Sequence, residues 1–159
     1  MEQRKTYIRF ISILLITLWV YTAANKLMDV GLFRSQLARQ PFSPAFAPLL
    51  TWFLPIIELA AAYLLMFTKT RTAGMLLSFL LMTVFSIYVA LAVTGFWENI
   101  PCSCGGVLNR LGWKDHLWFN LFFTALAGIG IYLSRKSHRK DSLKQVAFSG
   151  EPVKRRNNN

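Results

Sequence analysis

Residues 48–67 read PLLTWFLPIIELAAAYLLMF, an apolar run whose single charge, Glu58, lies near its middle. A helix that crosses the hydrocarbon layer of a bilayer needs about 20 such residues. Only a helix or a closed barrel can satisfy its backbone hydrogen bonds in lipid. The stretch therefore predicts a membrane-spanning helix that carries a carboxyl group inside it.

Three further apolar runs of similar length lie at residues 7–24, 73–93 and 116–133. The last of these is preceded by Asp115, a residue type that commonly caps helix N-termini. The composition agrees, because 54% of the 159 residues are hydrophobic and 16% are charged, whereas roughly a quarter of a globular sequence is charged. We therefore predict an all-α, four-transmembrane-helix bundle over residues 1–133.

Basic residues are divided unequally between the two sides of such a bundle. Of the 18 Lys and Arg residues, 13 fall at the N-terminus, in the turn after the second run and in the tail after the fourth, and five fall elsewhere. The positive-inside rule predicts that both termini lie in the cytoplasm and the two longer loops outside. A cleaved signal peptide is the alternative for residues 7–24, and it leaves the outer loops outside. The net charge of +11 does not indicate nucleic-acid binding, because the basic residues do not share a face with aromatic ones.

The segments outside the four runs are predicted to differ from each other. In residues 25–47 apolar residues recur at helical spacing, which predicts a short interfacial helix that lies on the membrane and ends at Pro41. Residues 134–159 are polar and basic, and we expect a disordered cytoplasmic tail that anchors the topology, with binding to anionic lipid as the alternative role. The apolar residues of the predicted interfacial helix are Leu27, Val30, Phe33 and Leu37.

The two cysteines of the chain, Cys102 and Cys104, lie in the loop before the fourth run, on the predicted outer side. A disulfide between residues two apart closes a small, strained ring, and strained, accessible disulfides exchange most readily. Cys104 also precedes a predicted short helix that ends at Gly112, and a helix N-terminus favours the thiolate. A redox-active dithiol with two catalytic cysteines is the leading hypothesis. A passive disulfide, free thiols or a copper(I) site are alternatives, although no further Cys or Met cluster supports a metal.

Glu58 is the second candidate, because a carboxyl group inside a membrane span is costly unless it faces the bundle interior and finds a partner. Lys26, at the outer end of the first run, is predicted to be that partner. Asn25, His116 and Asn120 are predicted to complete a polar cluster around the pair. The alternative is that Glu58 is protonated and only joins two helices by a hydrogen bond.

The order of these motifs resembles that in the MauE-like branch of the DoxX-like four-helix membrane proteins, which is named for methylamine utilisation. The resemblance covers residues 10–132. It implies a cytoplasmic-membrane protein that acts with a thioredoxin-like partner in maturing a disulfide-rich periplasmic protein. It rests on Asn25-Lys26-Leu27, Phe33, Pro55-x-x-Glu58 and Cys102-x-Cys104-Gly105-Gly106.

Three functions are compatible with these residues. The leading one is a membrane component of periplasmic thiol-disulfide exchange, whose single cysteine pair passes electrons directly to a bound quinone or to another protein. The bundle around Glu58 is one place for a quinone head to bind. The second is a non-enzymatic membrane accessory or scaffold protein with a structural Cys-x-Cys. The third, a small transporter lined by Glu58 and Lys26, is disfavoured because no pair of broken helices accompanies the carboxyl group.

Overall fold

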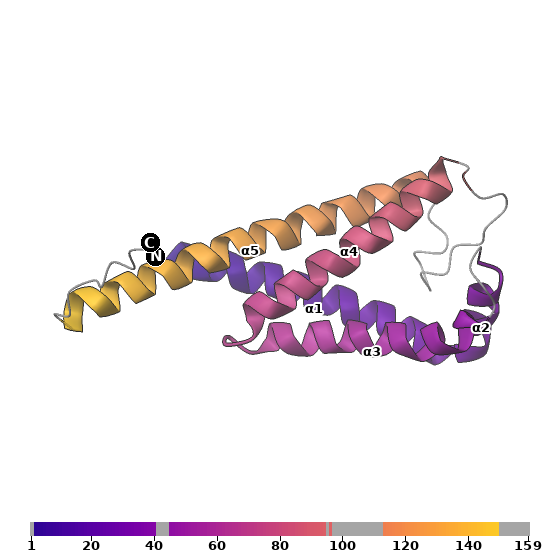
Figure 1. Cartoon of the computed structure of the whole chain (residues 1–159), viewed down its shortest axis with the longest axis horizontal. Coiled ribbons are helices and arrows are strands. Elements are labelled where there is room, and N and C mark those ends of the chain that lie inside the picture. The colour runs from indigo at the N-terminus through magenta and orange to yellow at the C-terminus, as the bar shows by residue number, and fades with distance from the viewer. Residues whose placement is uncertain (1, 41–44, 95, 97–112, 150–159) are drawn as a thin grey trace, which may run out of the picture.

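The computed structural model describes residues 2–40, 45–94, 96 and 113–149, and only the backbone at residues 2, 113 and 137–149. These residues form α-helices joined by short turns, and the four-helix prediction is confirmed (Figure 1). Four of the helices are long and apolar enough to cross a membrane. The helices are α1 (Glu2–Met28), α2 (Val30–Ala38), α3 (Phe46–Met66), α4 (Arg71–Val93) and α5 (Trp113–Ser149).

The ends of the helices differ from the predicted runs. All four long helices begin before the apolar run that predicted them, and α1 and α5 also end after it, because extending a formed helix avoids the cost of nucleation. Asp115, the predicted N-cap, lies inside the first turn of α5. A carboxylate in that turn still interacts favourably with the helix dipole. A short helix is present in the predicted segment as α2, which ends at Ala38, before Pro41, whereas Leu27 belongs to α1.

The polar tail is helical over much of its length, which corrects the expectation of disorder for residues 134–149. α5 continues from the apolar segment to Ser149 without a break. This stretch has no Gly or Pro and is rich in residues that favour helix. Because it extends an existing helix, it avoids the cost of nucleation. Residues 150–159 lie outside the described residues.

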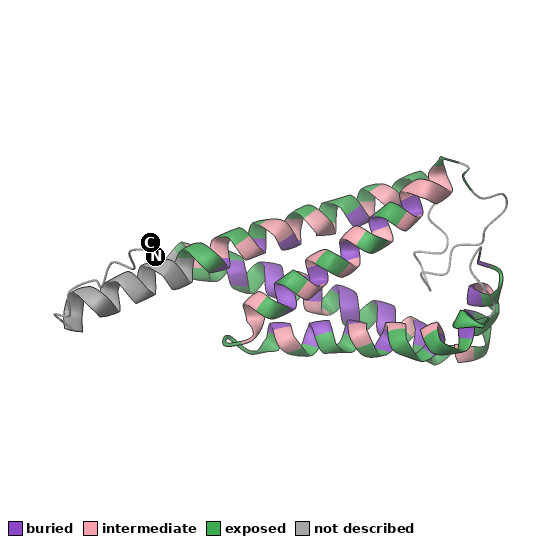
Figure 2. Ribbon diagram, viewed as in Figure 1, coloured by how far each residue is buried: buried purple, intermediate pink, exposed green. Residues whose placement is uncertain are grey.

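The four long helices form a ring in the order α1, α3, α4, α5, in which each helix packs on its two neighbours. Figure 1 shows α3 and α4 close together at their connecting turn and spread apart toward the end where α2 lies. The core holds side chains from every helix of the ring, and Figure 2 shows buried residues on the inward faces. Fully enclosed examples are Leu15, Trp19, Leu65, Met75 and Ala127.

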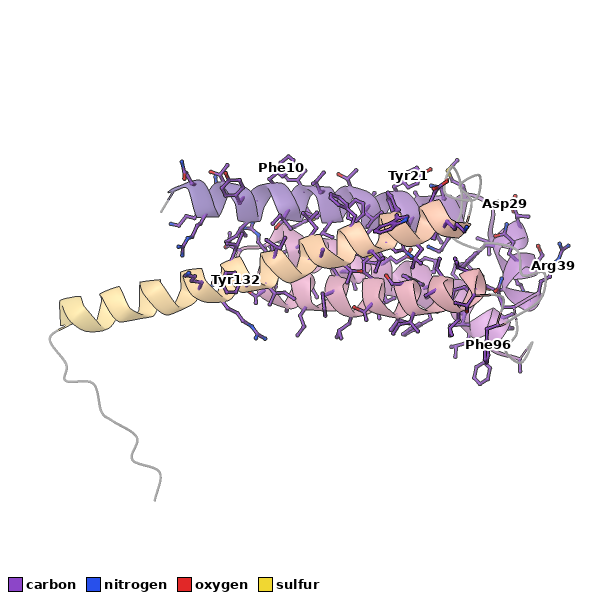
Figure 3. All side chains as sticks on the ribbon, turned by 90° about the horizontal axis from the view of Figure 1, so that it is seen from above. Phe10, Tyr21, Asp29, Arg39, Phe96 and Tyr132 are labelled. Carbon is purple, nitrogen blue, oxygen red and sulfur yellow. The ribbon has the colours of Figure 1, made fainter. Side chains whose placement is uncertain are left out.

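Large apolar side chains cover the outside of the ring. Phe10, Ile56, Val84 and Phe122 are each more than half exposed, and Figure 3 shows the side chains around Phe10 pointing away from the bundle. Soluble monomers rarely expose contiguous apolar surface on this scale. Together with the four long apolar helices, this surface identifies a multi-pass membrane protein.

Polar side chains link the helices inside the ring. Membrane helices gain little from hydrophobic burial against one another, so close packing and interhelical hydrogen bonds hold them together. One such bond crosses from α1 to α4, and two join α4 to α5. They are Trp19 Nε1 to Ser78 Oγ (2.9 Å), Ser86 Oγ with Thr124 Oγ1 (3.3 Å) and Thr72 Oγ1 with Ser134 Oγ (2.5 Å).

Gly74 allows α3 and α4 to approach closely beside their connecting turn. A Cβ atom at this position would lie 2.8 Å from the backbone nitrogen of Leu65 and 3.0 Å from the carbonyl carbon of Leu64. Backbone atoms cannot move aside as the end of a flexible side chain can. The tight end of the ring therefore depends on the absence of a side chain at Gly74.

We expect Gly74→Ala to lower the free energy of unfolding by about 1–3 kcal/mol, because the added methyl group forces α3 and α4 apart. Gly128→Ala is the matched control, since a Cβ there would meet the Phe79 ring at an ordinary 3.5 Å. The control should be neutral or stabilising by up to about 1 kcal/mol. Denaturant unfolding in mixed micelles measures both, and equal effects would contradict the close approach.

Candidate functional site

An ion pair joins α1 to α3 inside the bundle. Lys26 Nζ lies 2.6 Å from Glu58 Oε1, and the two residues are 5% and 1% exposed. Removing a single charge from water costs several kcal/mol, so each group needs the other to be stable there. The predicted contact between these residues is present in the structure.

The sequence around Lys26 explains how its ammonium group is held. Lys26 lies in the last turn of α1, where the helix dipole favours a cation. Asp29 follows and caps α2, because its Oδ1 accepts a hydrogen bond from the Leu32 backbone N–H at 2.9 Å. The chain thereby folds back so that the Phe33 ring lies 5.8 Å from Lys26 Nζ, within the range of a cation–π contact.

A cavity of about 240 Å³ lies beside the ion pair. It is walled by the second half of α1 and of α4, the first half of α3 and of α5, and by α2, so it occupies the end of the ring where the helices spread apart (Figure 1). Most of its wall is apolar. The aromatic residues in the wall are Trp19, Phe33, Phe85, Tyr88 and Phe119.

Three polar atoms in the cavity wall have no hydrogen-bond partner among the described residues. They are Glu58 Oε2, His116 Nδ1 and Asn120 Nδ2, on residues that are 1%, 2% and 4% exposed. His116 and Asn120 lie four residues apart on α5 and therefore share one face of that helix. A buried polar atom without a partner costs about 1–3 kcal/mol. Unsatisfied donors and acceptors around an apolar cavity are typical of a ligand site.

α2 covers the end of the cavity away from the α3–α4 turn. Phe33 and Leu37 are buried against Ala47 and the first turns of α3. Beyond them the Tyr88 hydroxyl of α4 donates a hydrogen bond to Gln40 Oε1, just after α2. The short helix thus contacts both α3 and, through Gln40, α4.

The structure brings together four of the five predicted cluster residues, and Asn25 is the exception. Its side-chain amide donates to the Tyr21 carbonyl of the same helix at 2.8 Å, and the residue is half-buried and does not line the cavity. Consecutive helical residues point about 100° apart, so Asn25 and Lys26 cannot both face the cavity. The four that line the cavity are Lys26, Glu58, His116 and Asn120.

Cys102 and Cys104 lie outside the described residues. The segment that carries them joins the end of α4 to the beginning of α5, and both of these helix ends belong to the half of the ring that holds the cavity (Figure 1). The described residues contain no group of three His, Cys, Asp or Glu side chains that could hold a metal ion.

Sequence reasoning missed Trp19, Gln40 and Tyr88 as wall residues of the cavity. An aromatic residue in an apolar run is equally compatible with a lipid-facing position, so Trp19 and Tyr88 carried no signal. Ser78 and Ser86 did indicate which side of α4 faces the bundle interior, because they are polar and lie eight residues apart on one face of the helix. That face points inward, where Ser78 accepts the hydrogen bond from the Trp19 indole.

A family model described as "Methylamine utilisation protein MauE" matches residues 4–133 of the chain. The match covers the four long apolar helices and α2. Neither a curated protein nor a solved structure matches the chain.

We expect Lys26→Met and Glu58→Leu each to lower the free energy of unfolding by about 3–5 kcal/mol, because each leaves an unpaired buried charge. The double variant should recover most of this loss, since no charge remains unpaired. Arg34→Met is a control for removal of an exposed cation and should change stability by less than about 0.5 kcal/mol. A double-mutant cycle in micelles measures the coupling, and additive effects would show that the two charges do not support each other.

Proposed function

The chain belongs to the MauE family of methylamine utilisation proteins, and we propose that it supports periplasmic protein maturation by exchanging disulfides through Cys102 and Cys104. Family membership indicates a membrane accessory protein of methylamine utilisation. Disulfide exchange through the two cysteines is what we propose beyond this family assignment. A periplasmic thioredoxin-like protein is the proposed partner, and the inner membrane, with both termini in the cytoplasm, is the proposed location.

The observation that carries the proposal is where the cavity lies in the ring. Tyr88 near the end of α4 and His116 near the beginning of α5 are both wall residues. The segment with the two cysteines leaves from the first of these helices and returns to the second. A mostly apolar cavity that contains a few buried polar groups, next to a loop that carries the cysteine pair, suits a protein that couples disulfide exchange at the surface to a site inside the membrane.

The proposed reaction is balanced within the two proteins. A thiolate of the partner attacks one sulfur of the Cys102–Cys104 disulfide, so a mixed disulfide forms and the other cysteine leaves as a thiolate. The second partner thiolate then attacks the mixed disulfide. The partner gains a disulfide, and the cysteine pair gains two electrons and two protons. The reverse sequence would deliver a disulfide to this chain.

Single-cysteine variants test the exchange in its reverse direction, in which the remaining cysteine attacks the partner disulfide and no second cysteine of this chain is left to resolve the mixed disulfide. We expect Cys102→Ser, which keeps Cys104, to accumulate a reducible higher-mass adduct on non-reducing gels of acid-quenched cells. Cys104→Ser should trap less, since Cys104 is the better attacking thiol if it precedes a helix. The double-serine variant is the control. If neither single variant forms an adduct and periplasmic disulfide proteins mature normally, the cysteines are structural and the protein is a scaffold.

The proposed sidedness has its own test. In intact cells, after mild reduction, a membrane-impermeant maleimide should label Cys102 and Cys104. In the double-serine background, Thr68→Cys provides a matched site in the exposed α3–α4 turn at the opposite end of the ring (Figure 1). It should be labelled only after the cells are permeabilised, because the positive-inside rule places that turn in the cytoplasm. The reversed pattern would invert the topology.

A further inference from the structure

We propose that the cavity beside Lys26 and Glu58 binds the head of a quinone or its quinol, with the apolar tail of that molecule in the surrounding lipid. The size and lining of the cavity are the first support. An apolar cavity of about 150 Å³ can hold a benzene ring, so about 240 Å³ accommodates a single substituted ring. Phe85 and Phe119, which are half-buried, offer aromatic faces for such a ring, and Trp19 lies in the wall beside them.

The polar atoms without a partner among the described residues are the second support, because they include both a hydrogen-bond donor and a hydrogen-bond acceptor. The Asn120 Nδ2 amide is a donor and requires an acceptor such as a ring carbonyl. The Glu58 Oε2 oxygen is an acceptor and requires a donor such as a ring hydroxyl. A quinone supplies the first and its quinol the second on the same ring. An acyl chain of a lipid supplies neither.

The third support is the way into the cavity. Val84 of α4 lines the cavity and is also 63% exposed on the outer surface of the ring. Leu50 and Leu54 of α3, which line it as well, are only half-buried. The described wall residues that reach the outer surface of the ring therefore lie on α3 and α4. They are apolar, whereas α2 covers the end of the bundle, so this side of the cavity favours a ligand dissolved in the bilayer.

The role of such a ligand rests on the proposed function. Oxidation of one dithiol to a disulfide releases two electrons and two protons, and these convert one quinone to one quinol. The binding itself does not depend on the cysteines, because every residue that carries the argument lies on α1, α3, α4 or α5.

Quinone binding can be measured on the full chain in lipid nanodiscs by titration with decylubiquinone. Trp19 in the cavity wall is the reporter, and we expect saturable quenching of its fluorescence that a Trp19→Phe variant loses. Asn120→Leu removes one hydrogen-bond donor and should weaken binding about five- to tenfold. Asn25→Leu is the matched control, since it makes the same change at an amide that follows Tyr21 on α1 and does not line the cavity, and its affinity should equal that of the unaltered chain.

Decylbenzene, which has the same tail and no oxygen atoms, distinguishes a quinone site from a general apolar one. If decylbenzene displaces decylubiquinone with equal affinity, or if the two asparagine variants bind alike, the proposal is overturned and the cavity accepts acyl chains. The Cys102→Ser/Cys104→Ser variant should bind the quinone unchanged. Binding without mixed disulfides would defeat only the proposed exchange, and mixed disulfides without binding would defeat only this inference.

Discussion

An ammonium group and a carboxylate that share the interior of a membrane bundle constrain the structure around them. Each charge alone is expensive in lipid, by about 2.5–3.5 kcal/mol even on the most lenient scales. The 2.6 Å contact between Lys26 and Glu58 therefore fixes the last turn of α1 against the middle of α3. The remaining oxygen of Glu58 has no partner among the described residues. The pair thus holds two helices in register and still presents an acceptor to the cavity.

The two ends of the ring are built differently, and the cavity follows from that difference. At one end a short turn and Gly74 bring α3 and α4 into backbone contact. At the other end the helices spread, and α2 covers the space by packing Phe33 and Leu37 on α3. A bundle that was tight at both ends would leave no room beside the ion pair. Because of this asymmetry, the tightly packed apolar core lies toward the α3–α4 turn and the site with the ion pair lies toward α2.

Much of the architecture could be predicted from sequence, because long apolar runs have few alternatives in lipid. The partnership of Lys26 and Glu58 was also predictable, since a buried charge needs an opposite one and few were available. The direction of the Asn25 side chain could not be predicted, because consecutive residues of a helix point about 100° apart and this rotation decides whether a side chain faces the cavity or the exterior. Tyr88 and Gln40 meet only in three dimensions, and nothing local marks either one. The helical tail was missed because polar composition was read as disorder while its helix propensity was not weighed.

The ion pair also bears on how the chain enters the membrane during synthesis. The two charged residues are 32 positions apart, and α1 leaves the ribosome before α3. Before α3 is present, Lys26 can extend its long side chain from the end of α1 to the polar headgroups. Glu58 lies in the middle of α3, and its shorter side chain cannot reach the headgroups. Its helix lies in the bilayer at low cost only beside the ammonium group of Lys26, so we expect α1 and α3 to enter the membrane together.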